Sequence, residues 1–195
     1  MKHLLIMLGL LISNFTITAQ EISPENTALI LIDIQDFYFP GGKSELLDPD
    51  IAGKHAAQIL EKFRKEEMLV VHVRHNVESG GDIQKSVKPM EGEKVISKDE
   101  VNAFNGTQLK TYLDDNNIEQ VVLVGMQTHM CLEGTTRAAY DFGYECVVIG
   151  DACATKDLEY EDRVIKAAEV HYSTLKTLQS YASVVSTEEF LKPQK

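Results

Sequence analysis

The stretch VVLVGMQTHMCLEGTTRAAYDFGY, residues 121–144, places an apolar run, a short polar loop and a helix-like segment in direct succession. The apolar run is rich in valine, which favours a strand that is buried on both faces. A single thiol, Cys131, falls where the loop passes into the expected helix. At the start of a helix, a sulfur atom meets unpaired N–H groups and the positive end of the helix dipole, which stabilise thiolate over thiol. The stretch therefore predicts a strand, a loop and a helix that together present a reactive cysteine.

Short apolar runs of the same kind recur along the chain, with helix-length segments at 50–67, 106–117, 131–143 and 161–179 between them. This alternation predicts an α/β fold with right-handed crossovers, a three-layer α/β/α sandwich around a mostly parallel six-stranded sheet. In such a Rossmann-like sheet, ligands bind at the carboxyl ends of the strands. The six expected strands are TALILID (27–33), MLVVHVR (68–74), KVIS (94–97), QVVLVG (120–125), CVVIGD (146–151) and ASVVS (182–186).

The chain of 195 residues is long enough for one well-buried domain and too short for two ordinary ones. Its first twenty residues, MKHLLIMLGLLISNFTITAQ, have the pattern of a secretory signal: a basic Lys2, an apolar run from residue 4 to 12, and small or polar residues near Gln20. A membrane anchor is the alternative, but the apolar run is too short to span a bilayer. We expect a signal peptide at 1–20, export to the periplasm or medium, and one domain at 21–195.

The chain has 19 basic and 30 acidic residues, which give a formal net charge of −11. This sign argues against nucleic acid or an anionic membrane as a partner. We expect a small-molecule substrate, no nucleic-acid partner, no membrane association after signal cleavage, and a homo-oligomer.

The three cysteines, Cys131, Cys146 and Cys153, are an odd number, so at least one has no partner within the chain. Cys146 and Cys153 bracket an expected strand, and seven residues at about 3.3 Å each hold them far beyond disulfide distance. We therefore expect stability to come from a core and not from a disulfide framework.

Residues capable of chemistry follow several of the strands: Asp33 the first, Lys98 the third, Cys131 the fourth and Asp151 the fifth. Each alone has an ordinary explanation, as a helix cap, a solvated cation or a small buried apolar residue. At one edge of one sheet, however, a thiol, a carboxylate and an ammonium supply a nucleophile, an acid/base and a stabilising cation for covalent acyl transfer. Backbone N–H groups of the loop 125–131 could form the oxyanion hole.

Three blocks, ALILIDIQDFYFPGG, VISKDEVNAFNGTQL and VVLVGMQTHMCLEGTTRAAYDFGYECVVIGDACAT, resemble the signature blocks of the isochorismatase-like cysteine hydrolases. This superfamily includes nicotinamidases and other amidohydrolases, and the resemblance covers essentially all of residues 21–195. It implies that Asp33 is the general base, Lys98 the triad lysine and Cys131 the nucleophile, which cleave an amide-type C–N bond through a thioester. It also implies a cis peptide bond between Met126 and Gln127, whose neighbouring N–H helps to bind the oxyanion.

We expect the substrate pocket to be lined by side chains near these blocks. Aromatic residues at such positions pack in the core about as often, which is the alternative for three of them. The expected lining residues are Phe37, Tyr38, His75, Phe104 and Gln127.

The family's metal-dependent nicotinamidases carry an Asp and two His residues after the second strand, whereas this chain has His72 and His75 with no Asp between them. Residues three apart on a strand point to opposite faces, so the two rings cannot easily share one ion. We predict no metal and no cofactor, and hydrogen-bonding or structural roles for both rings. His129 also stands where nicotinamidases commonly carry an acidic residue, which weakens the nicotinamide interpretation.

Two other classes remain open. A catalytically silent binding protein would be favoured by loss of Asp33, Lys98 or Cys131, and none is lost. A thiol redox protein would be suggested by three cysteines in an exported chain, but there is no C-x-x-C pair and the nearest candidate to resolve Cys131 is Cys153.

Overall fold

The protein is represented by a computed structural model that describes residues 24–193. The expected signal peptide and the domain boundary at residue 21 lie outside the described residues. None of the helices in the described part of the chain is long and apolar enough to cross a membrane.

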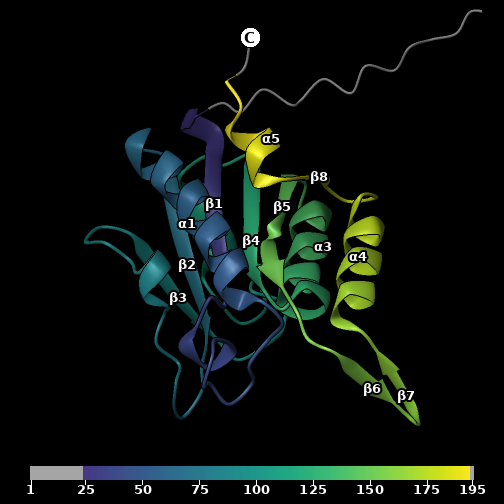
Figure 1. The fold of residues 1–195 in the computed structure, drawn as a ribbon. Helices are drawn as coiled ribbons and strands as arrows, with labels where there is room; N and C mark the ends of the chain where they lie inside the picture. The colour runs from purple at the N-terminus through teal and green to yellow at the C-terminus, as the bar shows by residue number, and fades with distance from the viewer. Residues whose placement is uncertain (1–23, 194–195) are drawn as a thin grey trace, which may run out of the picture.

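A six-stranded sheet forms the centre of the molecule, and every neighbouring pair of its strands is parallel (Figure 1). The order across the sheet is β3-β2-β1-β4-β5-β8, so β1 lies at the middle with β2 on one side and β4 on the other. The prediction of a parallel six-stranded sheet is confirmed. The strands are β1 (Thr27–Ile32), β2 (Leu69–His75), β3 (Lys94–Lys98), β4 (Gln120–Met126), β5 (Glu145–Ala154) and β8 (Ser183–Val185).

Helices cover both faces of the sheet, which completes the predicted three layers. Buried side chains of α1 and α5 belong to the core on one face, and those of α2, α3 and α4 to the core on the other. The helices are α1 (Pro49–Lys65), α2 (Leu109–Asp115), α3 (Glu133–Asp141), α4 (Ala167–Leu178) and α5 (Thr187–Leu191). Shorter helical segments are η1 (Pro24–Asn26), η2 (Asp36–Tyr38), η3 (Lys85–Val87) and η4 (Thr128–Leu132), the last a π-helical turn.

The residues of β1 show why these strands are apolar throughout. Ile30 and Ile32 pack into the core beneath α2 to α4, whereas Leu29 and Leu31 pack beneath α1, and all four are buried. Because successive side chains on a strand point to opposite faces, a strand covered on both sides needs an apolar residue at every position.

The main chains of β1 and β4 lie close together at their carboxyl ends, next to Asp33 and the loop that follows β4. Ile32 lies opposite Gly125 in the ladder, and a side chain at Gly125 would collide with the Ile32 carbonyl oxygen. The φ angle of Gly125, +129°, is also one that L-residues rarely adopt. Only glycine fits there, and it holds the loop that follows β4 against the end of β1.

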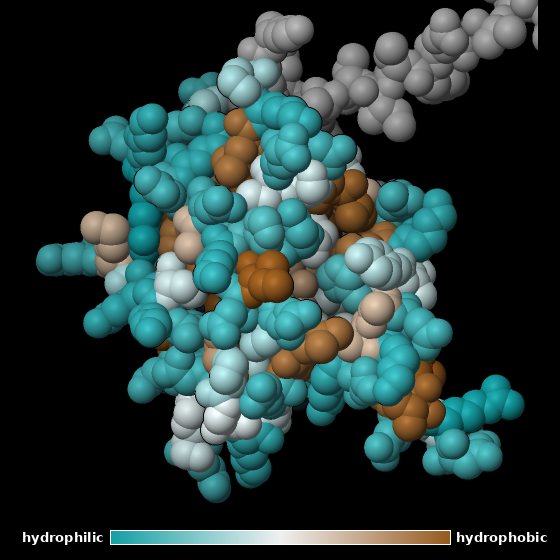
Figure 2. All heavy atoms as spheres, viewed as in Figure 1, coloured by the Kyte–Doolittle hydropathy of each residue, from teal (hydrophilic) through white to brown (hydrophobic). Residues whose placement is uncertain are grey.

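The helix expected over 161–179 is shorter than predicted, because its first residues form a hairpin instead. The strands β6 (Leu158–Tyr160) and β7 (Arg163–Ile165) pair antiparallel, with Glu161 at φ +55° in the turn. The hairpin projects from the body of the molecule and exposes apolar side chains, Val164 and Ile165 among them (Figures 1 and 2).

Polar contacts fix the start of α4 at Ala167. Asp157 Oδ1 accepts a hydrogen bond from the Ala167 N–H at 2.8 Å, and Glu169 accepts one from the Lys166 N–H at 3.0 Å. These contacts satisfy amide groups that the first turn of a helix leaves unpaired. The boundary depends on a carboxylate ten residues upstream, which the helical periodicity of the segment does not reveal.

Candidate active site

Lys98 lies at the centre of a cluster at the carboxyl ends of the strands. Its Nζ atom is 2.7 Å from Asp33 Oδ2, 3.3 Å from Cys131 Sγ and 3.1 Å from His75 Nδ1. It also donates to the carbonyl oxygen of Glu100 at 3.0 Å. Asp33 and Lys98 are 0% and 1% exposed, and Cys131 is 6% exposed. The structure thus brings together the three residues that strand-end positions and the family resemblance singled out.

The parallel register explains why these side chains meet. Asp33 directly follows β1, and its N–H donates to the Val73 carbonyl of β2 at 2.9 Å. Lys98 is the last residue of β3 and lies opposite His75 of β2 in the ladder. Because β1 lies between β2 and β4, its carboxyl end is the place where groups from both sides can converge. Asp33 itself has a φ of +49°, an unusual backbone conformation of the kind often found at functional sites.

Cys131 lies within the π-helical turn η4, two residues before α3 begins at Glu133. Burial first, and then the negative charge of Asp33, raise the pKa of the Cys131 thiol to about 12, while Lys98 acts in the opposite direction. This direction runs against the expectation that the start of the helix favours the thiolate, because loss of water around the sulfur disfavours its charged form.

Asp33 is correspondingly a stronger base than an ordinary carboxylate. Burial raises the pKa of Asp33, against the opposing effects of the Lys98 ammonium and of contact with Cys131. A carboxylate whose proton affinity is raised is suited to take a proton from a neighbouring thiol and to return it later.

The peptide bond between Met126 and Gln127 is cis, as the family resemblance implies. Gln127 is 6% exposed, and its Nε2 atom donates to the Tyr38 hydroxyl at 3.2 Å. Its Oε1 atom is buried without a hydrogen-bond donor among residues 24–193. Burial, with smaller contributions from the charges of Cys131 and Asp33, raises the pKa of Tyr38 to about 12 against the opposing effect of the hydrogen bond with Gln127, so the Tyr38 hydroxyl lies within the field of the site.

The remaining expected pocket residues separate into two groups. Phe37 is half-buried and its ring packs on Tyr38, with centroids 4.1 Å apart, so it lies beside the site. The ring of Phe104 packs against Phe142 and Tyr144, which follow the carboxyl end of α3. Its role in the pocket stays a prediction, since Phe104 and Cys131 belong to the same buried cluster.

Gln35 is a residue of this site whose role the sequence did not reveal. It is 0% exposed, and its Oε1 accepts from the His75 N–H at 2.7 Å. Its Nε2 donates to the carbonyl oxygens of His75 at 3.0 Å and of Gly81 at 2.8 Å. The side chain thus ties the end of β2 and the following loop to the segment after Asp33. In the sequence, the only sign of this role was the position of Gln35, two residues after the aspartate that ends the first expected strand.

Side chains from α4 and from the residue directly after β5 anchor the loop that carries Cys131. The Thr128 hydroxyl lies 3.0 Å from His171 Nδ1 of α4, and His129 Nδ1 lies 2.7 Å from the Thr155 hydroxyl. Asp151 has the ordinary role of a cap: its Oδ1 accepts from the Thr187 N–H at 2.8 Å, at the start of α5.

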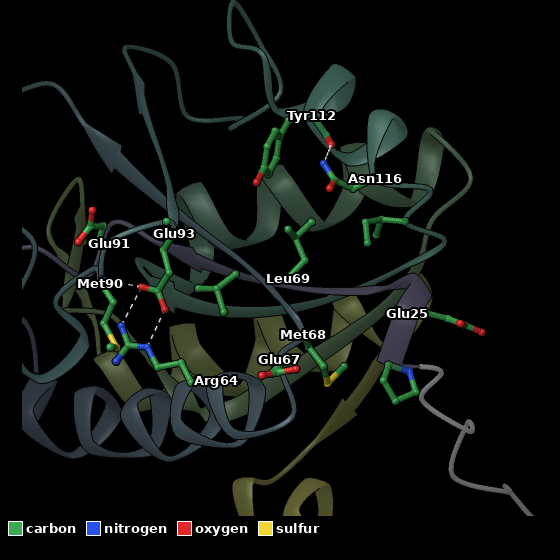
Figure 3. Close-up of a pocket in the computed structure, with 14 residues that line it drawn as sticks. Glu25, Arg64, Glu67, Met68, Leu69, Met90, Glu91, Glu93, Tyr112 and Asn116 are labelled. Carbon is green, nitrogen blue, oxygen red and sulfur yellow. Dashed lines mark hydrogen bonds and ion pairs between the residues drawn. The ribbon is translucent and has the colours of Figure 1, made fainter.

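His72 and His75 have separate surroundings, as predicted from their spacing. His72 Nε2 lies 2.9 Å from Glu93 Oε2, and Arg64 holds the same carboxylate with Nε 2.6 Å from Oε1. This network borders a cavity of about 490 Å³ at the opposite edge of the sheet from Lys98 (Figure 3). Among residues 24–193, no three His, Cys, Asp or Glu side chains lie together in a way that could hold a metal ion. The side chains present therefore do not fit the metal site of the nicotinamidases.

The Glu93 network predicts a loss of stability in acid. Burial raises the pKa of Glu93, but hydrogen bonds from Arg64, the Met90 N–H and His72 outweigh it and lower the pKa from 4.5 to about 2. A carboxylate with a lowered folded-state pKa stabilises the protein above its unfolded pKa, and that contribution is lost as the pH falls toward the folded value.

We therefore expect the melting temperature to fall between about pH 4.5 and about pH 2 more steeply in the wild type than in Glu93→Gln. Glu66→Gln, which removes a partly exposed pair with Lys62, is the matched control and should resemble the wild type. Equal steepness in Glu93→Gln and the wild type would contradict the assignment.

The fold and the cluster define a three-layer α/β/α domain with a buried cysteine, carboxylate and lysine at the carboxyl ends of its parallel strands. Residues 27–189 match the isochorismatase domain, so the chain belongs to the isochorismatase family. YddQ of Bacillus subtilis, an uncharacterized member, is 42% identical over 178 residues, which are 85% of this chain and 99% of YddQ. The crystal structure of an isochorismatase-type hydrolase from Oleispira antarctica superposes with a TM-score of 0.83 at 42% identity, covering 88% of this chain and 98% of that one.

A more distant relative has a named activity. The ureidoacrylate amidohydrolase RutB of Caulobacter segnis is 27% identical over 210 residues, covering 85% of this chain and 84% of RutB. The protein is thus an isochorismatase-family hydrolase.

Proposed function

We propose that the protein hydrolyses an amide-type C–N bond of a small molecule, with Cys131 as nucleophile, Asp33 as acid/base and Lys98 as the stabilising cation. One observation carries the proposal: Lys98 Nζ contacts Asp33 at 2.7 Å and Cys131 at 3.3 Å in a buried site. The amidohydrolase activity named for RutB supports the reaction class.

In the first half of the reaction, Asp33 takes the proton of the Cys131 thiol as the sulfur attacks the substrate carbonyl carbon. A C–S bond forms, and the negative charge that develops on the carbonyl oxygen is met by backbone N–H groups of the loop 125–131. The C–N bond then breaks while Asp33 returns its proton to the leaving nitrogen, which leaves a thioester on Cys131.

In the second half, water attacks the thioester carbonyl and gives a proton to Asp33. The C–S bond breaks, the sulfur leaves as a thiolate beside Lys98, and the proton on Asp33 returns to it. The carboxylic acid product departs and the resting thiol is restored. Lys98 remains charged throughout and stabilises whichever neighbour is negative.

The buried Gln127 Oε1 supports a nitrogen-bearing substrate over an ester. This acceptor has no donor among the described residues, and leaving a buried polar atom unpaired is costly. An N–H of an amide or ureide would satisfy it, whereas an ester oxygen could not. Tyr38, bonded to the same side chain, supplies a hydroxyl on the same side.

The other two thiols argue against a redox protein. Cys146 and Cys153 are free and buried, and burial raises the pKa of each to about 12. Cys153 Sγ also donates to the Ile149 carbonyl at 3.2 Å. Thiol–disulfide exchange needs an accessible thiolate, and neither residue provides one. A silent binding protein is disfavoured because all three triad residues are in contact.

A substrate panel tests the proposal. Purified protein is offered small amides, ureides and matched esters, with ammonia or amine release as readout and a chelator present in one series. We expect release from some amides or ureides, unaffected by the chelator, and an acyl adduct on Cys131 after acid quench. The proposal would be contradicted if no compound released ammonia or amine. It would also be contradicted if the chelator abolished the activity and added zinc restored it.

Export through residues 1–20 is part of the same proposal and is supported by the leader pattern around Lys2. The reaction would then take place outside the cytoplasm. A homo-oligomer likewise remains our expectation.

A further inference from the structure

Lys98 Nζ has three hydrogen-bond partners, Cys131 Sγ, His75 Nδ1 and the Glu100 carbonyl oxygen, and forms an ion pair with Asp33 Oδ2 at 2.7 Å. Neither Asp33 oxygen makes a hydrogen bond among the described residues. The three hydrogens of an ammonium group match the three hydrogen-bond partners. In the proposed reaction Asp33 and Cys131 exchange a proton, so their charges change at each step, whereas His75 and the Glu100 carbonyl stay as they are.

The contact between Lys98 and His75 assigns a role to each atom once Lys98 is the ammonium group of the proposed triad. An ammonium group can donate but cannot accept, so Nδ1 of His75 is then the acceptor and the ring hydrogen lies on Nε2. A second donor on Nδ1 would place two N–H groups against each other at 3.1 Å.

Gln35 holds His75 in this position from the backbone side. The orientation of the Gln35 amide is determined, because its oxygen accepts from the His75 N–H and its nitrogen donates to two carbonyl groups. The next residue, Asn76, donates its N–H to the Lys98 carbonyl at 2.9 Å. The end of β2 is thus tied to Lys98 through the main chain of Asn76 and the side chain of His75.

The triad shares two protons among three groups, which allows three arrangements. In one, Asp33 and Lys98 are charged and Cys131 is a thiol; in another, Lys98 and Cys131 are charged and Asp33 is protonated. In the third, Asp33 and Cys131 hold both protons and Lys98 is a neutral amine. In any buried site an uncharged arrangement competes with the charged ones, because each charge removed from water is costly. That arrangement contains no thiolate and no cation, so it cannot react.

We propose that His75 is a positioning residue that, with the Glu100 carbonyl, keeps the proton on Lys98 and so excludes the uncharged arrangement. Two acceptors whose charge never changes stabilise the ammonium in both reactive arrangements and offer less to a neutral amine. Gln35 in turn positions His75. This inference rests on the proposed triad, but it concerns the readiness of the thiol and not the choice of substrate.

Alkylation of Cys131 by iodoacetamide tests the inference without any substrate. The rate is followed at Cys131 by peptide mass spectrometry in the wild type, His75→Leu, His75→Asn and Ser97→Ala. The Asn side chain offers an oxygen close to the position of Nδ1, whereas Leu offers none. Ser97 is exposed and precedes Lys98 on the same strand, so its alanine variant is the matched control.

We expect His75→Leu to slow alkylation about ten-fold, the order that one hydrogen bond to a charged group produces, and His75→Asn to restore it to within about three-fold. Ser97→Ala should match the wild type, and melting temperatures should show that all variants fold. An unchanged rate in His75→Leu, or an equal loss in the Leu and Asn variants, would overturn the inference.

The same set of variants separates this inference from the proposed function. Slower alkylation of Cys131 in His75→Leu and a restored rate in His75→Asn, without cleavage of any amide, would support the inference and contradict the proposed amide hydrolysis. Cys131-dependent hydrolysis with unchanged alkylation in His75→Leu would do the reverse.

Discussion

Replacing Cys131 with alanine should abolish hydrolysis and leave the fold intact. Cys131 is the only thiol beside both Asp33 and Lys98, and removal of the nucleophile of a covalent hydrolase costs on the order of 10³-fold or more in turnover. The side chain is small and makes few polar contacts, so the melting temperature should change little. The measurement is kcat on a substrate found in the amide panel, with circular dichroism to verify the fold.

Cys146→Ala and Cys153→Ala are the matched controls for this experiment. Both thiols are buried like Cys131, but they bond to main-chain carbonyls and contact neither Asp33 nor Lys98 in any recorded hydrogen bond among residues 24–193. They should retain most of the activity. Near wild-type turnover in Cys131→Ala would show that the thioester mechanism is wrong.

Asp33→Asn should cost nearly as much rate as Cys131→Ala, and adding Lys98→Ala should then cost little more. Asparagine preserves the size of the side chain but cannot take the proton from the thiol or return it to the leaving nitrogen. Residues that act as one unit have effects that do not add, so the double variant should resemble the single one. The measurement is kcat in the two single variants and the double variant.

The pH profile of Cys131 alkylation separates this view from activation by the helix end alone. The Asp33 charge raises the pKa of Cys131 and Lys98 lowers it. Asp33→Asn should therefore shift the labelling profile to lower pH and Lys98→Ala to higher pH, although hydrolysis falls in both. Unchanged profiles in both variants would leave the start of α3 as the sole activator and remove the two residues from the mechanism.

The sheet and the meeting of Asp33, Lys98 and Cys131 could be predicted because both follow from local, regular patterns. Strands such as β1 are apolar along their length, which is the pattern of a covered parallel sheet, and the carboxyl ends of such strands converge. That geometry placed the three residues at one edge, whereas their proposed roles came from the resemblance to the isochorismatase-like hydrolases.

Features that depend on long-range contacts could not be predicted. The start of α4 after the hairpin receives a hydrogen-bond acceptor from Asp157, ten residues before Ala167, and the ring of Phe104 packs against Phe142 and Tyr144 from beyond α3. The resting state of Cys131 depends on how little water reaches the sulfur, which no spacing of residues conveys. The clamp formed by Gln35 depends on two backbone segments that meet only in the folded chain.

The raised pKa of Cys131 has a consequence for the lifetime of the protein. Thiolates attack peroxides and disulfides, whereas protonated thiols react with them only slowly. A nucleophile that stays protonated until a substrate arrives is therefore less exposed to oxidation during idle periods. Since burial also raises the pKa of Cys146 and Cys153, the same lower reactivity applies to the other two thiols.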